Sequence, residues 1–129
     1  MKGGGQGGRP RVLVVDDDDA IAELAREILA PEGYAVATAR EGAEALKLVR
    51  LHDPDVMLVD LRLPIMDGPS FIEQYRAQGG HARTFIFSAA SELPTLLPMA
   101  GVDGAIAKPF ELDALLEAVA WATNAEAAP

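Results

Sequence analysis

Short apolar runs alternate along this chain with stretches in which apolar residues recur every three or four positions. Apolar runs without polar alternation are typical of strands that are covered on both faces, as in a parallel sheet. Two of the runs are continuous and three are shorter or more mixed: 12–15 and 56–59, then 34–38, 85–87 and 105–107. The pattern therefore predicts five strands, with 34–38 as an edge strand.

Helical periodicity fills the intervals between these runs. Apolar residues at positions 21, 24, 25, 28 and 29 have the spacing of an amphipathic helix and predict a helix over 21–29. Shorter patterns of the same kind predict further helices over 43–49, 71–75 and 112–119, with a weaker one over 91–99. A strand followed by a helix thus occurs five times, which favours one parallel sheet with helices on both faces.

The two ends of the chain differ in composition from its centre. Five of the first eight residues are glycine, and Pro10 closes this segment. Because glycine-rich segments behave as flexible coils, we expect a flexible tail over 1–10, one domain over 11–123 and a short tail over 124–129. A length of 129 residues fits a single domain, and we interpret the chain as a stand-alone domain without an effector domain.

Composition and charge exclude several functional classes. No apolar run approaches the ~20 residues that a membrane span needs, and the glycine-rich start lacks the apolar stretch of a signal peptide. The net charge of -9 and the scattered basic residues argue against direct contact with nucleic acid. The absence of cysteine excludes disulfides and thiolate metal sites, and it favours a cytoplasmic location.

Polar residues stand at the downstream ends of four predicted strands. The carboxyl ends of parallel strands meet at one edge of the sheet, where ligands bind in open α/β folds. These residues are Asp16 and Asp17, Asp60, Ser88 and Lys108. Their shared position predicts one site made of three carboxylates, a hydroxyl and an ammonium group.

Such a set of side chains favours phosphoryl transfer with a magnesium ion. Converging carboxylates repel one another, and a hard divalent cation relieves that repulsion. Oxygen ligands without cysteine or histidine favour Mg²⁺ over zinc, and Mg²⁺ would bridge a carboxylate to a phosphoryl oxygen. Lys108 would supply a second positive charge and Ser88 a neutral donor. Asp60 would then be the nucleophile, since carboxylates can form acyl phosphates.

The acidic run over 16–19 holds residues with two different roles. Aspartate is favoured at the cap and in the first turn of a helix. We therefore interpret Asp18 and Asp19, which lie next to the predicted helix over 21–29, as capping residues. Asp16 and Asp17 are nearer to the end of the strand, and we interpret them as metal ligands.

Three segments resemble the receiver domain of bacterial two-component response regulators, and the resemblance runs from about Arg11 to Thr123. The segments are VLVVDDDDAI from Val12, PDVMLVDLRLPIMDG from Pro54 and GVDGAIAKPFELDALLEAV from Gly101. The resemblance implies an α/β, flavodoxin-like, doubly wound fold, with a five-stranded parallel sheet in the order 2-1-3-4-5 and helices on both faces.

The resemblance also implies roles for the acidic residues. Asp60 would be the phospho-acceptor. Asp17 and Asp60 would bind Mg²⁺ directly, and Asp16 would act largely through water. The backbone carbonyl of Arg62 would complete the metal site.

Two further side chains and one peptide bond belong to the same family pattern. Ser88 and Lys108 would hold phosphoryl oxygens, and the peptide bond before Pro109 would be cis. Adjacent strands lie ~4.8 Å apart, so Asp60 on the third strand would neighbour both Ser88 and the acidic pair. Lys108, two strands away at about 10 Å, must lean its long side chain across the fourth strand.

A receiver of this kind takes a phosphoryl group from a histidine kinase or phosphotransfer protein and signals to a downstream protein partner. It is not an enzyme in the usual sense, because it catalyses only its own phosphotransfer and dephosphorylation. Alternatives are a docking module that works without phosphorylation, which the complete set of site residues argues against, and a passive phospho-sink. A haloacid dehalogenase phosphatase needs aspartate where the chain has Arg62, and a dinucleotide fingerprint must follow the first strand, which the glycine-rich segment precedes.

The chain departs from the family pattern at two places. Receivers usually carry Tyr or Phe three positions before the lysine, and that side chain moves inward on activation, but here the residue is Ala105. The segment between the serine and the lysine is about two residues shorter than is common, and it holds Pro94 and Pro98. Since Pro98 must cut or kink a helix, we expect activation to act through the backbone of residues 88–97.

Overall fold

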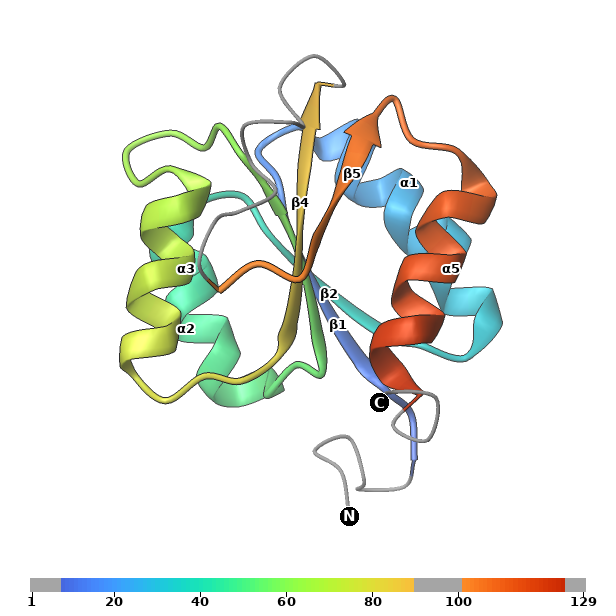
Figure 1. Ribbon diagram of the computed structural model, residues 1–129, viewed down its shortest axis with the longest axis horizontal. Helices are drawn as coiled ribbons and strands as arrows, with labels where there is room; N and C mark the ends of the chain where they lie inside the picture. Colours follow the sequence, from blue (N-terminus) through green and yellow to red (C-terminus); the bar gives the residue numbers. More distant parts are fainter. Residues whose placement is uncertain (1–7, 90–100, 125–129) are drawn as a thin grey trace.

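The computed structural model describes residues 8–89 and 101–124, in which strands and helices alternate (Figure 1). The strands are β1 (Arg11–Val15), β2 (Ala35–Ala39), β3 (Val56–Asp60), β4 (Arg83–Ala89) and β5 (Gly104–Lys108). The helices are α1 (Asp19–Leu29), α2 (Gly42–His52), α3 (Gly68–Ala77) and α5 (Leu112–Thr123), and a short 3-10 helix, η2 (Ala30–Glu32), follows α1.

The strands form one parallel sheet in the order β2-β1-β3-β4-β5. β1 lies between β2 and β3, and its Val14 is in register with Thr38 on one side and Leu58 on the other. β3 in turn pairs with β4, and β4 pairs with β5. All residues of β3 are buried, and all of β1 except Arg11, so the two apolar runs that are continuous in the sequence form central strands.

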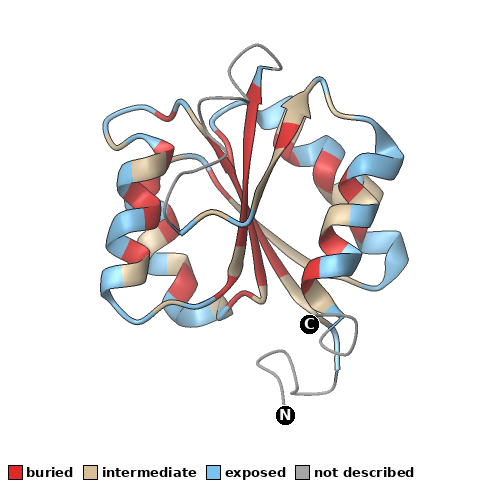
Figure 2. Cartoon of the chain, viewed as in Figure 1, coloured by how far each residue is buried: buried red, intermediate tan, exposed pale blue. Residues whose placement is uncertain are grey.

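Alternate residues of the central strands face two separate hydrophobic layers. Val12 and Val14 pack with α1 and α5 on one face, whereas Leu13 and Val15 pack with α2 and α3 on the other. Figure 1 shows these helix pairs on opposite sides of the sheet, and Figure 2 shows the buried residues concentrated in the strands between them. Helices on both faces explain why β1 and β3 need no polar alternation.

The sequence-based prediction of the fold is confirmed. All five predicted strands are present, in the order that the resemblance implied. The helices predicted over 21–29, 43–49, 71–75 and 112–119 correspond to α1, α2, α3 and α5. The weak helix predicted over 91–99 lies outside the described residues. Within the described part of the chain, no helix combines the length and the apolar character that crossing a bilayer requires.

Side chains tie the loops together where the strands begin, an end of the sheet that we call the amino edge. Arg76 from α3 donates to the carbonyl of Gly101 at 2.8 Å and to Thr84 Oγ1 at 3.1 Å. It also donates to the carbonyl of Gly80 at 3.2 Å. Asp103 accepts a hydrogen bond from the Thr84 amide at 2.8 Å. Arg76 therefore joins α3, β4 and the segment that leads into β5.

A second group of polar contacts at the amino edge surrounds the start of β1. The amide of Arg11 donates to Asp55 Oδ2 at 2.9 Å, and its guanidinium donates to the carbonyl of His52 at 3.0 Å. His52 Nε2 lies 3.2 Å from the carbonyl oxygen of Val12. Burial lowers the pKa of His52 below its ordinary value, because the charged imidazolium is poorly solvated there.

Candidate functional site

The predicted polar residues meet at the opposite end of the sheet, the carboxyl edge. Asp16 and Asp17 follow β1 directly, Asp60 ends β3, Ser88 lies one residue before the end of β4 and Lys108 ends β5. Asp16, Asp60 and Ser88 are buried, whereas Asp17 is exposed. The structure therefore places at one edge of the sheet all of the side chains that were assigned to one site from the sequence.

Lys108 reaches the acidic residues by crossing β4. Its ammonium nitrogen lies 3.0 Å from Asp16 Oδ2 and 3.2 Å from Asp60 Oδ1. The same nitrogen lies 5.9 Å from the centre of the Phe87 ring, which belongs to β4. Burial lowers the pKa of Lys108, but the carboxylates of Asp16 and Asp60 outweigh burial and raise it above its ordinary value. Lys108 is thus a firmly charged cation inside the carboxylate cluster.

Asp16 is held rigidly at the bottom of the site. Its side chain is fully buried, its amide donates to the carbonyl of Ala39 at 2.9 Å, and its Oδ1 accepts from the Asp18 amide at 2.9 Å. Burial raises the pKa of Asp16 above its ordinary value, although the Asp18 amide and the Lys108 ammonium oppose this shift. A raised pKa means that the site would gain from additional positive charge near Asp16.

The carboxylates are close enough to share one cation. One oxygen from each of Asp16, Asp17 and Asp60 lies within 4.8 Å of the others. Among the described residues, Asp16 Oδ2 has no partner in hydrogen-bond geometry, although the Lys108 ammonium is 3.0 Å away. A buried oxygen in this state is stabilised by a cation or by a water molecule bound to one. Because the donor set is all oxygen, the residues present fit a magnesium ion.

The acidic residues that were interpreted as caps lie outside this cluster. Asp18 is the cap of α1, and its Oδ1 accepts from the amides of Ala20 at 2.9 Å and Ile21 at 3.4 Å. Asp19 is the first residue of α1, and its carboxylate lies 3.3 Å from Nε of Arg40. The division of the acidic run into two structural groups therefore agrees with the structure.

Two other predicted residues are in place, but their roles remain predictions. The Ser88 hydroxyl donates to the carbonyl of Ala89 at 3.3 Å, a bond that it can exchange for another acceptor by rotation. The amide of Arg62 donates to Asp60 Oδ1 at 3.5 Å, while its side chain is exposed. This contact places the backbone of Arg62 beside the Asp60 carboxylate, as a metal-binding carbonyl at that residue would require.

One site residue was not found from the sequence. Gly68, the first residue of α3, donates to the carbonyl of Leu61 at 3.0 Å, and a Cβ at this position would meet the carbonyl oxygen of Asp60. The cap of α3 is Asp67, which accepts from the Ser70 amide at 2.9 Å, and this bond lowers the pKa of Asp67. The Asp67-Gly68 pair marked a turn in the sequence but gave no sign of this close packing.

On the β5 side of the site, one detail of the family pattern is confirmed. The Lys108-Pro109 peptide bond is cis, as the resemblance implied. Ala105, in register with Ile86 of β4, lies in a groove of about 400 Å³ between β5 and α5, which is also lined by Phe85 and Phe110. The alanine leaves this edge of the sheet without an aromatic side chain at that position.

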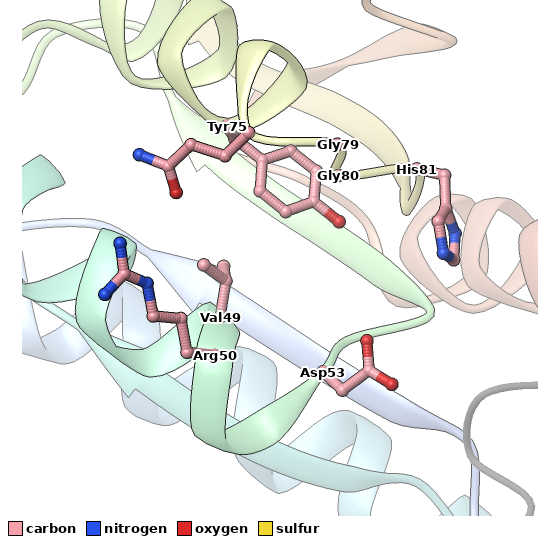
Figure 3. A pocket seen from close by; sticks show the side chains of 8 residues that line it. Val49, Arg50, Asp53, Tyr75, Gly79, Gly80 and His81 are labelled. Carbon is pink, nitrogen blue, oxygen red and sulfur yellow. The ribbon is translucent and has the colours of Figure 1, made fainter.

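A smaller hollow of about 270 Å³ lies at the amino edge and contains none of the predicted site residues (Figure 3). The ends of α2 and α3 form it, and Arg50, Asp53 and Tyr75 are among its lining residues. The amides of Gly79 and Gly80, which also line it, donate to carbonyls of α3 and are not available to a ligand. The carboxyl edge, where the predicted residues meet, is therefore the candidate site.

Residues 12–120 match the family described as the response regulator receiver domain. The transcriptional regulatory protein PrrA of Mycobacterium tuberculosis is 40% identical over 113 residues, which are 85% of this chain and 48% of that protein. The response regulator MprA of Mycobacterium avium is 35% identical over 108 residues, 82% of this chain and 47% of that protein. This chain belongs to the response regulator receiver domain family, and it spans about half the length of the curated relatives it matches.

Solved structures agree with this assignment. A putative response regulator from Chloroflexus aurantiacus superposes with a TM-score of 0.82 at 29% identity, covering 89% of this chain and 98% of that one. The receiver domain of the Francisella response regulator 1452 superposes with a TM-score of 0.79 at 32% identity, covering 88% and 96%. The five-stranded receiver fold is therefore shared along almost the whole length of these neighbours, and family membership supports a role in phosphorelay signalling.

Proposed function

We propose that this domain accepts a phosphoryl group on Asp60 from the phosphohistidine of a histidine kinase or phosphotransfer protein, in a reaction that depends on Mg²⁺. The observation that carries the proposal is the Lys108 ammonium, 3.2 Å from Asp60 Oδ1 inside a cluster of three carboxylates. A purely structural ion pair needs one carboxylate for one lysine. The excess of carboxylates, two of them buried, is costly without a further cation and suits a magnesium-dependent phosphoryl site.

In the proposed reaction, a carboxylate oxygen of Asp60 attacks the phosphorus atom of the donor. The bond between phosphorus and the imidazole nitrogen breaks, and its electron pair stays on the imidazole. The product is an acyl phosphate on Asp60. Asp60 is suited to this step because it ends the central strand, where it is in register with Phe87 of β4 and follows Val59, which is in register with Val15 of β1.

The neighbouring residues stabilise the charge that the transfer brings into the site. Lys108 is already beside Asp60 and would pair with a phosphoryl oxygen. Ser88 would donate its hydroxyl to another phosphoryl oxygen. Asp16, Asp17 and Asp60, with the carbonyl of Arg62, would hold the magnesium ion. When bound, Mg²⁺ supplies electrostatic stabilisation of the phosphoryl oxygens.

The output of the domain follows from the same proposal. The domain would act on no substrate besides its donor and its own acyl phosphate, and it would signal in the cytoplasm by contact with a downstream protein. Its net charge of -9 gives no basis for direct nucleic-acid binding by this domain. The groove beside Ala105 suggests that activation proceeds without the aromatic rotamer change that is usual in receivers.

Incubation with acetyl phosphate tests the chemistry directly. We expect intact-mass measurements to show addition of one phosphoryl group in the presence of Mg²⁺ and none after chelation with EDTA. Asp60→Asn should abolish the addition while the circular dichroism spectrum stays unchanged. Asp53→Asn, which alters an exposed carboxylate at the amino edge, is the matched control and should label like the wild type. Undiminished labelling of the Asp60→Asn protein would refute the assignment of the acceptor.

A further inference from the structure

Ile65 combines two unfavourable features in the loop between β3 and α3. Its side chain is 94% exposed, the most exposed of the large apolar side chains in the described part of the chain. Its backbone φ is +69°, in the left-handed region that β-branched residues avoid because Cβ approaches the backbone. The only other non-glycine residue with positive φ in the described chain is Asp53, a residue type that tolerates this region well.

The strain at Ile65 belongs to a specific turn. The amide of Met66 donates to the carbonyl of Pro64 at 2.7 Å, so Ile65 is the central residue of a three-residue turn. With a positive φ at the centre, this is the rare and strained form of the γ-turn. Glycine or asparagine would relieve the strain and remove the exposed apolar surface at the same time. The isoleucine therefore does not serve the stability of the free domain.

The turn projects from a loop that is anchored against the proposed phosphoryl site. The Gly68 amide donates to the carbonyl of Leu61, and Gly68 packs directly against the backbone of Asp60. Ile65 is three residues from Gly68, so the two Cα atoms are at most about 11 Å apart. Figure 1 shows this loop running from the end of β3 to the start of α3 at the carboxyl edge.

We propose that Ile65 is an apolar contact for the protein that donates the phosphoryl group to Asp60. The proposal rests on the function proposed above. It identifies Ile65 as a residue that favours phosphoryl transfer from a protein donor over transfer from a small molecule. A stable protein interface covers about 800 Å² of each partner, a disc of radius about 16 Å, so a donor centred over Asp60 must also cover Ile65. Docking would bury the exposed side chain against the donor, whereas acetyl phosphate is too small to touch it while reacting.

Leu51 provides a matched control for exposure. It is 82% exposed but lies in the last turn of α2, with helical backbone geometry and at the amino edge. A donor that reaches Asp60 from the carboxyl edge has no access to Leu51. Ile65 and Leu51 have side chains of the same size, so comparing them separates a contact at the docking site from a general effect of surface hydrophobicity.

The experiment compares two phosphoryl donors on the same set of receivers. Histidine kinases of the source organism are autophosphorylated with radiolabelled ATP, and the kinase that labels the wild-type domain fastest is used. Receivers are wild type, Ile65→Asn, Ile65→Val and Leu51→Asn. With the kinase, we expect kcat/KM to fall about tenfold for Ile65→Asn, as loss of one buried isoleucine contact predicts, and mainly through KM.

The other measurements separate contact from structure. Ile65→Val and Leu51→Asn should stay within about twofold of the wild type with the kinase, and all variants should do so with acetyl phosphate. The urea midpoint of Ile65→Asn should rise, because asparagine accepts the positive φ. Equal kinase rates for wild type and Ile65→Asn would overturn the proposal. So would an equal loss with acetyl phosphate, or a wild-type domain that acetyl phosphate labels and no kinase does. If acetyl phosphate fails to label wild-type Asp60, the proposed function itself fails.

Discussion

At the amino edge of the sheet, charged side chains hold loops together, whereas at the carboxyl edge they crowd around one lysine. Arg76 makes three hydrogen bonds, to Gly80 in the loop after α3, to Thr84 on β4 and to Gly101 in the segment before β5. In contrast, Lys108 faces two carboxylates, one of which keeps a buried oxygen outside hydrogen-bond geometry among the described residues. Polar groups that hydrogen-bond to one another stabilise a fold. Buried polar groups that lack such partners mark a place where a ligand can bind.

This comparison predicts that substitutions at the two edges have separable effects. Changes at the carboxyl edge should alter metal and phosphoryl chemistry with little loss of stability. Changes at the amino edge should lower the free energy of unfolding while the chemistry remains.

Removing an exposed carboxylate from the cluster of Asp16, Asp17 and Asp60 should have the largest effect. Asp17→Ala removes one of the oxygens that lie within 4.8 Å of one another, so we expect the affinity for Mg²⁺ to fall about 100-fold. Isothermal titration with MgCl₂ measures this directly. The stability that Mg²⁺ adds should fall in parallel, because binding to the native state alone is linked to unfolding.

Asp19→Ala is the control for this substitution. Asp19 is also exposed and lies two residues further along, but its carboxylate pairs with Arg40 and is not part of the carboxylate cluster. We expect its Mg²⁺ affinity to match the wild type. A larger loss of affinity in Asp19→Ala than in Asp17→Ala would show that the acidic run is divided wrongly between ligands and cap.

At the amino edge, Arg76→Ala should lower the free energy of unfolding by about 2–3 kcal/mol. The substitution removes the hydrogen bonds to Gly80, Thr84 and Gly101, and bonds from a charged donor contribute more than neutral ones. Urea denaturation measures the loss. Labelling by acetyl phosphate should continue at the wild-type rate under native conditions, since Arg76 lies far from the carboxyl edge.

Arg50→Ala is the matched control for Arg76→Ala. Arg50 is exposed at the end of α2, and we expect the free energy of unfolding to change by less than about 0.5 kcal/mol. If Arg76→Ala abolished labelling of a protein that is still folded, the two edges would be coupled and the separation drawn above would not hold.

The smallest expected effect is a pH dependence of stability at the amino edge. Burial lowers the pKa of His52 in the folded state, so below the unfolded pKa of about 6.5 the unfolded chain binds more protons. Stability is therefore fully present above about pH 6.5 and falls as the pH drops toward the lowered pKa. We expect His52 to contribute a decrease of less than about 1 kcal/mol between pH 7.5 and pH 5.5.

Urea denaturation at both pH values measures this contribution when His52→Gln is compared with His81→Gln. The chain contains two histidines, and each variant lacks one of them. The decrease in stability should be smaller in His52→Gln, which lacks the half-buried imidazole. An unchanged decrease in that variant would show that other groups account for the pH dependence.

Much of the fold was predictable because its strands and helices follow simple patterns of apolar and polar residues. Continuous apolar runs marked the central strands, and helical periodicity marked the helices that cover them. The order of the strands was not predictable from periodicity, since pairing depends on crossovers between distant segments. It came from the resemblance to receivers. The convergence of Asp16, Asp60 and Lys108 was predictable because parallel strands all end at one edge.

Other features could not be predicted from the sequence. Arg76 and its partners are separated by up to 25 residues, and none of them interrupts a periodic pattern. Nor did the sequence predict the γ-turn. A β-branched residue argues against positive φ, so Ile65 between Pro64 and Met66 gave the opposite indication. Sequence patterns reflect the average conformational preference of each residue type. They miss positions such as Ile65, where a residue adopts a conformation that its type disfavours.

The direction of the first and last elements has a practical consequence. β1 starts at the amino edge, and α5 runs back from the carboxyl edge and ends on the same side as that start (Figure 1). A reporter or surface linker attached before Arg11 or after Thr123 therefore leaves from the side of the sheet opposite Asp60. Receivers immobilised through either end would present the carboxyl edge outward, so a sensor chip coated in this way could record donor docking without blocking it.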